Sequence, residues 1–359
     1  MITSHKKKIV VLGAGVSGLT CAHELAVHGH QVTVVAEKAA SQTTSVIAGA
    51  LWEWPPAVCG HHNDVHSLKR SKPWCVASYQ KFKELSRDSR TGVRLEQACF
   101  YFYGKVDDSE FERAKMNECR QHVDDFQHDA SLIQRNKVNE QLGLVDAYSY
   151  LAPVIDTPVY TRWLRERLGD MGVRFVKRKL FGTLESNLDI LDEFAASNLV
   201  NCTGLGAQQL ASDEVFPLRG ALIQVHRNST SDALVQGAHC ITHDENKPHQ
   251  NMIYLVPRGD KLLLGGIAQP DQWEDKLELE DSVVQGILER CLEFMPQLKS
   301  YPIDQKNPTL VGLRPARQKN VRLEKDSKQP FIHNYGHGGS GYSLSWGCAK
   351  EVAELVASS

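Results

Sequence analysis

The chain has 359 residues, of which 42% are hydrophobic and 23% charged, and its formal net charge is −2. This length suits about two globular domains, and the near-neutral charge argues against a nucleic-acid partner because no basic excess is present to neutralise phosphates. No stretch approaches the roughly 20 apolar residues that a membrane-spanning helix needs. A small-molecule partner is therefore expected.

The first fifty residues show the pattern of a βαβ unit. An apolar run over 9–12 precedes "GAGVSG", a helical pattern follows over 16–28, and a β-branched run over 31–36 ends at Glu37. The glycines fit G-x-G-x-x-G, in which the first allows a tight turn, the second lets a pyrophosphate approach, and the third lets helix and strand pack closely. An acid after the second strand is placed to bind ribose hydroxyls. The residues predicted to bind a dinucleotide are Gly13, Ala14, Gly15, Val16, Ser17, Gly18 and Glu37.

Between residues 57 and 157 the sequence becomes mixed and more polar. The stiff "WEWPP" at 52–56 comes just before this region, and helices are expected near 75–87 and 109–127. The change in composition predicts that the chain crosses into a second domain here.

From residue 158 the sequence again shows the helix and strand patterns and the glycine turn seen in its first fifty residues. A helix is predicted over 158–171 and a strand over 173–180, and "NLVNCTGLGA" predicts a strand that runs into a glycine turn at Thr203. From 216 to 311 alternating strands reappear, with a hairpin turn predicted at 258–260.

A second glycine-rich turn lies near the end of the sequence. The stretch "HNYGHGGSGYSLSWG" covers 333–347 and leads into a helical pattern of apolar residues that includes Leu344, Trp346 and Val352. A glycine-rich turn that opens a helix is suited to an anion, because backbone N–H groups and the helix dipole point at it. A nicotinamide dinucleotide site would explain the first turn and leave the second without a role.

Six sequence blocks, in order, resemble the D-amino acid oxidase family of FAD-dependent enzymes. They are "VLGAGVSGL", "TTSVIAGALW", "VNCTGLGA", "YLVPRGDKLLLGG", "VGLRPARQKNVRLE" and "HNYGHGGSGYSLSWGCA". The resemblance implies an α/β fold with a Rossmann-like FAD-binding domain built from three segments, 1–56, 158–215 and 312–359. A sheet-rich α+β substrate domain is expected to be inserted as residues 57–157 and 216–311.

The resemblance also implies a chemistry. FAD would be bound with its pyrophosphate at the first glycine turn and its flavin ring at the second, and a D-amino acid would be oxidised at Cα to an imine that water hydrolyses. The products would be a 2-oxo acid, ammonia and, once dioxygen takes the electrons, hydrogen peroxide. The further residues implied to bind FAD are Lys38, Thr43, Thr44, Ser45, Gly49, Ala50, Leu51, Leu180, Thr203, Gly338, Gly339, Ser340, Gly341, Tyr342 and Ser343.

An amino-acid substrate needs a clamp for its carboxylate, and the matched blocks offer one. Arg314 matches the family's substrate arginine, whose planar fork binds a carboxylate through two hydrogen bonds. Tyr254 matches a tyrosine that donates to the same carboxylate, and Gly339 matches a position near the substrate amine. Gln250 stands where many animal members carry a second tyrosine on a covering loop, so the resemblance leaves the substrate range open.

Several other functions share parts of this pattern. An oxidase of glycine, sarcosine or another secondary amine would have the same architecture. A flavin-binding protein without turnover would have no need of a carboxylate clamp. A D-aspartate oxidase would need a further cation for the second carboxylate, for which Arg219, Arg258 and Arg317 are the candidates.

Cysteine and histidine usage bears on metal binding and compartment. Five side chains that can ligate metals crowd one region, but their spacing fits no regular zinc pattern, so no metal is expected. They are Cys59, His61, His62, His66 and Cys75. Nine cysteines without short repeated spacings favour reduced thiols in a cytoplasmic protein. The sequence leaves open whether the chain forms a homo-oligomer.

Overall fold

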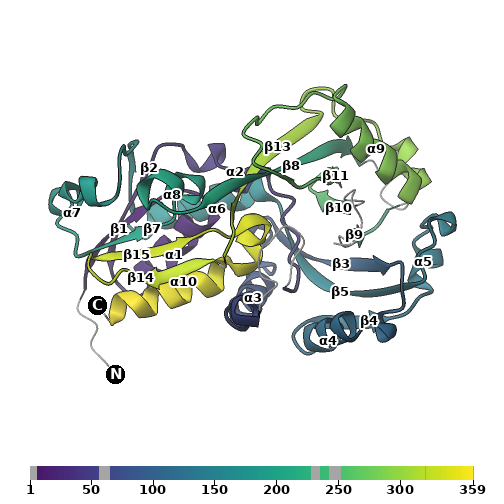
Figure 1. Ribbon diagram of the computed structural model, residues 1–359, viewed down its shortest axis with the longest axis horizontal. Helices are drawn as coiled ribbons and strands as arrows, with labels where there is room; N and C mark the ends of the chain where they lie inside the picture. The colour runs from purple at the N-terminus through teal and green to yellow at the C-terminus, as the bar shows by residue number, and fades with distance from the viewer. Residues whose placement is uncertain (1–5, 56–64, 228–234, 242–251, 320, 359) are drawn as a thin grey trace.

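Two β-sheets organise the molecule in the computed structural model, which describes residues 6–55, 65–227, 235–241, 252–319 and 321–358. One sheet has six strands and the other has nine. The two lie one after the other along the longest axis of the molecule (Figure 1). Within the described ranges, no helix combines the length and the apolar character needed to cross a membrane.

The six-stranded sheet is assembled from segments far apart in the sequence. Its order is β14 (Arg322–Lys325), β15 (Phe331–Tyr335), β7 (Asn198–Asn201), β1 (Lys8–Leu12), β2 (Gln31–Ala36) and β6 (Arg174–Lys177). Every neighbouring pair is parallel except β14 and β15, which are antiparallel. The strands predicted over 9–12 and 31–36 are confirmed, and the strand predicted over 173–180 ends at Lys177.

Helices cover both faces of this sheet. Helix α1 (Val16–Val27) packs against α10 (Gly341–Ala357) and α6 (Thr157–Asp170), and α10 also packs against α3 (Val65–Leu85). Side chains alternate along β1 as the pleat requires, so that Ile9 joins the core with α1 and α10 while Val10 joins a smaller core beneath α7 (Asp189–Glu193). The predicted helices over 16–28 and 158–171 are therefore confirmed to within one residue at each end.

The nine-stranded sheet is largely antiparallel. Its order is β12 (Gln269–Pro270), β8 (Val215–His226), β11 (Lys261–Gly265), β10 (Ile253–Arg258), β9 (Ala238–Ile241), β3 (Val93–Phe102), β5 (Asp146–Ile155) and β4 (Asp124–His128), with β13 (Thr309–Arg317) paired to β8. Helix α9 (Ser282–Phe294) packs on β8, β10 and β11. The hairpin predicted at 258–260 is confirmed, because Arg258 pairs with Lys261 across a turn in which Gly259 has a φ of +56°.

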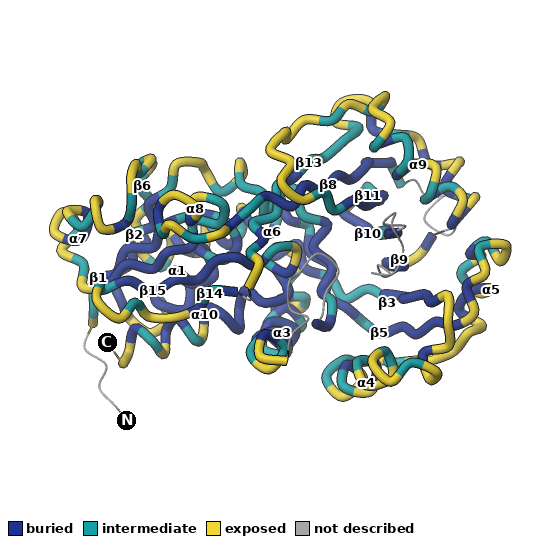
Figure 2. Tube along the Cα trace, in the orientation of Figure 1, coloured by how far each residue is buried: buried dark blue, intermediate teal, exposed yellow. Residues whose placement is uncertain are grey.

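Burial follows this arrangement. The inner strands β1, β7 and β15 of the first sheet and β8, β10 and β11 of the second are buried along most of their length, whereas the edge strands β4 and β6 have no buried residue. Helices α4 (Glu110–Cys119) and α7 expose one side to solvent (Figure 2). The remaining short helices are α2 (Thr44–Ile47), α5 (Leu132–Arg135), α8 (Ala207–Leu210) and the 3-10 turns at 40–42, 89–91, 106–108, 140–142, 185–187, 204–206, 296–300 and 338–340.

Two predicted helices differ from the observed ones. The helix expected near 75–87 begins at Val65 and continues through Pro73, because its early turns also pack against α10. A Cβ on Gly347 would lie 2.2 Å from the Cα atom of Trp74, so the absence of a side chain there lets the two helices approach closely. The prediction of one helix over 109–127 is wrong, because α4 ends at Cys119 and 124–128 adds the edge strand β4 to β5.

The predicted division into domains remains a prediction, and two elements bear on its boundaries. Helix α3 lies within the predicted substrate segment 57–157 and packs against α10 of the other region. Strand β13 pairs with β8 through Arg317, beyond the predicted boundary at 312. Residues from strands of both sheets line the cavity of the candidate active site.

Candidate active site

One cavity of about 620 Å³ extends from the carboxyl ends of β1 and β2 to β10 and β13. Of the residues predicted to bind cofactor or substrate, all but Gly18 and Ser340 line it. Those that line it are Gly13, Ala14, Gly15, Val16, Ser17, Glu37, Lys38, Thr43, Thr44, Ser45, Gly49, Ala50, Leu51, Leu180, Thr203, Tyr254, Arg314, Gly338, Gly339, Gly341, Tyr342 and Ser343. Residues from opposite ends of the sequence therefore face one space.

The first glycine turn is shaped by close backbone contacts. Gly13 has a φ of +105°, and a Cβ there would lie 2.4 Å from the carbonyl oxygen of Cys202. A Cβ on Gly18 would lie 2.0 Å from the carbonyl oxygen of Gly13, so Gly18 packs behind the turn and does not face the cavity. Gly15 is the N-cap residue of α1 and has no side chain to cap the helix, and the first turn carries no acidic residue. The N-terminus of α1 is thus open toward an anion in the cavity.

Two polar groups lie beside this turn. The Ser45 hydroxyl accepts a hydrogen bond from the backbone N–H of Val16 at 2.9 Å. Glu37, at the end of β2, accepts a hydrogen bond from Lys179 Nζ at 2.8 Å, and about half of each side chain is exposed. Because this pair is exposed at the edge of the cavity, the Glu37 carboxylate can exchange its lysine partner for ribose hydroxyls at little cost.

The second glycine turn faces the same cavity. Gly336 and Gly338 have φ values of +85° and +54°, and α10 begins at Gly341 without a side-chain cap or an acidic first turn. The Tyr342 hydroxyl donates to the carbonyl oxygen of Ser45 at 3.0 Å, and the hydroxyl of the same serine accepts from Val16 of the first turn, so Ser45 lies between the two turns. Ser340 is buried behind the turn, and its hydroxyl oxygen has no hydrogen-bond partner among the described residues.

This donor set fits FAD. Two helix N-termini, whose N-cap residues make no side-chain hydrogen bond, face one cavity, one for a diphosphate and one for a group that gains negative charge on reduction. Thr203 adds a hydroxyl that is oriented by the side chain of Asn201, to which it donates at 2.7 Å. The small residues at 48–50 leave room for a flat ring.

Arg314 and Tyr254 approach the cavity from neighbouring parts of the nine-stranded sheet. Arg314 Nη1 donates to the carbonyl oxygen of Ile267 at 2.9 Å, and a Cβ on Gly220 would lie 2.3 Å from the guanidinium. The Tyr254 hydroxyl accepts from the backbone N–H of Leu51 at 3.0 Å. Burial raises the pKa of Tyr254 well above its ordinary value, so the hydroxyl keeps its proton and is free to donate it to a ligand.

Glu53 also lines this end of the cavity, and sequence reasoning missed it. Burial raises its pKa to about 7, against the opposing effect of the positive charges on Lys115 and Arg314. The available signal was an acidic residue within the apolar stretch "ALWEWPP", between two matched blocks. A carboxyl group that titrates near neutrality in a ligand cavity is a candidate functional group.

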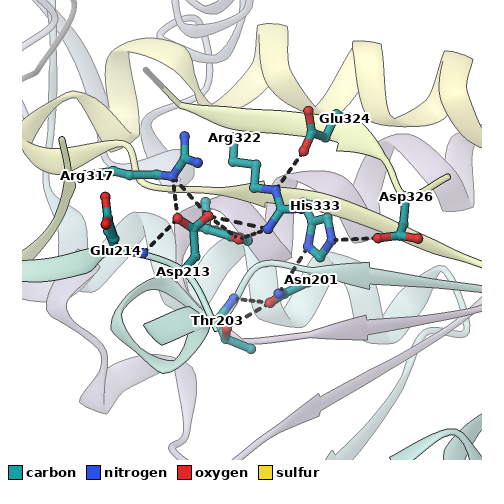
Figure 3. A network of polar contacts seen from close by, with 10 residues as sticks. Asn201, Thr203, Asp213, Glu214, Arg317, Arg322, Glu324, Asp326 and His333 are labelled. Atoms are coloured by element: carbon teal, nitrogen blue, oxygen red, sulfur yellow. Dashed lines mark hydrogen bonds and ion pairs between the residues drawn. The ribbon is translucent and has the colours of Figure 1, made fainter. Parts of the chain in front are cut away.

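The three arginines considered for a second substrate carboxylate lie elsewhere. Arg219 donates to Gln269 Oε1, Arg258 donates to the carbonyl oxygen of Ala48, and none of the three lines the cavity. Arg317 Nε contacts both carboxylate oxygens of Asp213 at 3.0 Å, within a polar network that also includes Arg322 (Figure 3). All three guanidinium groups therefore already donate to other groups of the protein.

Two predictions from the sequence fall at least partly outside the described residues. Cys59, His61 and His62 of the histidine-rich region and Gln250 all lie in segments that the structure does not describe. Cys75, which is described, is buried and donates to the carbonyl oxygen of Glu53. Across the described ranges, no group of three or more His, Cys, Asp or Glu side chains is arranged to hold a metal ion.

Comparisons with known proteins agree with the geometry of the cavity. The profile of the FAD dependent oxidoreductase (DAO) family matches residues 8–355. The chain is 32% identical to a D-amino-acid oxidase of Rubrobacter xylanophilus, covering 97% of this chain and 95% of that protein, and 33% identical to one of Streptomyces coelicolor, covering 97% and 96%. A glycine oxidase structure from Bacillus cereus has the same fold, with a TM-score of 0.74 and 18% identity over 98% of this chain and 95% of that one.

The family match covers nearly the whole chain, and both glycine turns and the cavity between them lie within the matched residues. The family is FAD-dependent, which agrees with the donor set of the cavity. The chain belongs to the DAO family and is an FAD-dependent oxidoreductase.

Proposed function

We propose that the chain oxidises a D-amino acid to a 2-oxo acid, ammonia and hydrogen peroxide. The observation that carries this proposal is the convergence of Arg314 and Tyr254 on the cavity to which the second glycine turn contributes. An arginine fork and a neutral phenol are suited to a carboxylate, and their place beside a flavin-sized space is suited to an amino acid. The relatives named D-amino-acid oxidase support the same substrate class.

The residues around the first turn would hold the dinucleotide part of FAD. Backbone N–H groups between Gly13 and Ser17 would face the diphosphate, and Glu37 would accept from the ribose hydroxyls. Gly49 to Leu51 and Gly338 to Ser343 would enclose the flavin ring. We propose the corresponding domain division, with an FAD-binding domain of 1–56, 158–215 and 312–359 and a substrate domain of 57–157 and 216–311.

The chemistry that bound FAD supplies is acceptance of the Cα hydrogen with its electron pair and transfer of two electrons and two protons to dioxygen. The protein's residues have to orient the substrate. Arg314 and Tyr254 would fix the carboxylate, and the backbone at Gly339 would lie near the amine. When the amine arrives neutral, its lone pair forms the C=N bond as hydride leaves, and no side chain is required as a base. Water then hydrolyses the imine.

The alternative substrates are distinguished by their charge and size. D-Aspartate would bring a second carboxylate, and the arginines considered for it contact Gln269, Ala48 and Asp213 instead. Glycine and sarcosine would fit the same clamp. The fold shared with a glycine oxidase carries no information about the substrate at 18% identity.

Peroxide release by the FAD-loaded protein tests this proposal. The panel should contain D- and L-amino acids, glycine and sarcosine, with catalase added to a parallel sample as a control. We expect the highest kcat/KM for D-amino acids, with stoichiometric ammonia. Turnover confined to glycine or sarcosine, or no turnover by a protein that holds its flavin, would reject the proposal.

A further inference from the structure

The proposed function leaves Glu53 without a role, although its side chain faces the substrate end of the cavity. The backbone on both sides of Glu53 is fixed. Its N–H donates to Ser343 Oγ at 3.3 Å, its carbonyl oxygen accepts from Cys75, and the N–H of Trp52 donates to Pro153. Trp52 and Trp54 are 0% and 4% exposed, so they occupy the core while the residue between them is directed to the cavity.

The Glu53 carboxylate has no hydrogen bond or ion pair with any described residue. The titratable groups that its charge affects come mainly from the nine-stranded sheet and its helices. They are Tyr148, Tyr150, Cys240, Tyr254, Cys75, Lys115 and Arg314. Burial raises the pKa of each of these tyrosines and cysteines, so they are neutral and leave the carboxylate charge uncompensated.

Only two cations face Glu53 from the described residues, and each has another partner when substrate is present. Lys115, on α4, lies 3.8 Å from Glu112 Oε2, and its side chain is 11% exposed. Arg314 would be neutralised by the carboxylate of the substrate under the proposed function. With the amine neutral, as hydride transfer requires, the occupied site would carry one unmatched negative charge, which is Glu53.

We propose that Glu53 binds the side chain of the substrate and that the cavity favours D-amino acids whose side chains end in a cation, such as D-arginine and D-lysine. This inference rests on the proposed function and specifies its substrate class. A cationic side chain restores the charge balance of the site, and a guanidinium can donate two hydrogen bonds to a carboxylate. D-Aspartate, by contrast, would place a second negative charge beside Glu53.

Two substrates of nearly equal shape isolate the charge. D-Arginine ends in a charged guanidinium and D-citrulline in a neutral urea. The ratio of their kcat/KM values in the holoenzyme therefore measures the effect of a positive charge at the end of the substrate side chain. We expect the wild type to favour D-arginine, and Glu53→Gln to lower the ratio by about tenfold or more, because a charge-assisted hydrogen bond is lost. Glu53→Asp, which keeps the charge, should retain part of the preference.

The pH dependence provides a second readout. Because burial raises the pKa of Glu53 to about 7, the D-arginine to D-citrulline ratio should rise between roughly pH 6 and pH 8 in the wild type and stay flat in Glu53→Gln. Glu96→Gln is the matched control, since it removes a carboxylate that pairs with Arg94 outside the cavity. It should leave both the ratio and its pH dependence unchanged.

Each failure has a distinct signature. An unchanged ratio in Glu53→Gln, with D-amino acids still oxidised, overturns this inference and leaves the proposed function standing. An equal loss for both substrates also overturns it, because Glu53 would then act on the shared amine or on Arg314. Failure of the wild type to oxidise any D-amino acid overturns the proposed function and this inference together.

Discussion

Replacing Arg314 removes the strongest of the contacts that we propose for the substrate carboxylate. The guanidinium donates from Nη1 to the carbonyl oxygen of Ile267 and lies in space that the missing side chain of Gly220 leaves open, so its other nitrogens remain for the substrate. Two charge-assisted hydrogen bonds at about 1.5–3 kcal/mol each would be lost in Arg314→Leu. We expect a loss of at least about 3 kcal/mol in transition-state binding, which is a factor of roughly 100 or more in kcat/KM.

Three companion variants separate charge from geometry. Arg314→Lys keeps the charge and loses the planar fork, so its kcat/KM should fall between wild type and Arg314→Leu. Gly220→Ala keeps the arginine and displaces it, because the new Cβ would lie 2.3 Å from the guanidinium, and should also lower kcat/KM. Arg94→Leu removes an arginine that does not line the cavity and should have no such effect.

The assay is peroxide release under steady-state conditions, with the visible absorption of bound flavin measured for every variant. Flavin should persist in all of them, because none of these residues is assigned to FAD. Near-normal kcat/KM in Arg314→Leu with its flavin retained would show that Arg314 does not bind the substrate carboxylate. The arginine would then be structural, and the carboxylate would be bound elsewhere.

Further predictions follow from other contacts. Tyr254→Phe should weaken transition-state binding by about 1 kcal/mol, which lowers kcat/KM roughly fivefold. It should also lower the unfolding temperature, because the N–H of Leu51 loses its hydrogen-bond acceptor. Unchanged kinetics would show that Tyr254 does not bind the substrate carboxylate. Gly13→Ala should abolish FAD retention, since its Cβ meets Cys202, whereas Gly143→Ala, also at positive φ but with open space around it, should retain FAD. Burial lowers the pKa of His239 and His333 to about 4, so the unfolded state binds protons that the native state excludes as pH falls below about 6.5. Stability measured by thermal unfolding should therefore fall from pH 7 to pH 5, by about 2 kcal/mol for each histidine, and a flat profile would contradict this assignment.

The local parts of the fold could be predicted from the sequence. A β-branched run, a glycine fingerprint and a helical period each depend on neighbours in the chain, and the elements at 9–12, 16–28 and 31–36 follow from them. The strand at 124–128 could not be predicted, because its position depends on pairing with β5. Four of its five residues are polar or charged, so the sequence shows no alternation of apolar and polar side chains there.

The candidate site divides in the same way. Gly13 and Gly338 have positive φ values, which the glycine motifs of the sequence indicate, and both residues line the cavity. Ser340 belongs to the same motif yet lies behind the turn, since the direction of its side chain depends on packing. Glu53 gains its character from burial and from charges on β13 and α4, which only the folded chain brings together.

In the proposed reaction, electrons pass from a D-amino acid through the flavin to dioxygen. This electron path can be followed by mixing the FAD-loaded protein with a D-amino acid in the absence of oxygen and then admitting air. We expect the D-amino acid to bleach the visible absorption of the flavin, the L-enantiomer to leave it unchanged, and air to restore the colour with one peroxide formed for each 2-oxo acid. Flavin that stays oxidised with every D-amino acid, or that is bleached and not restored by air, would contradict this electron path.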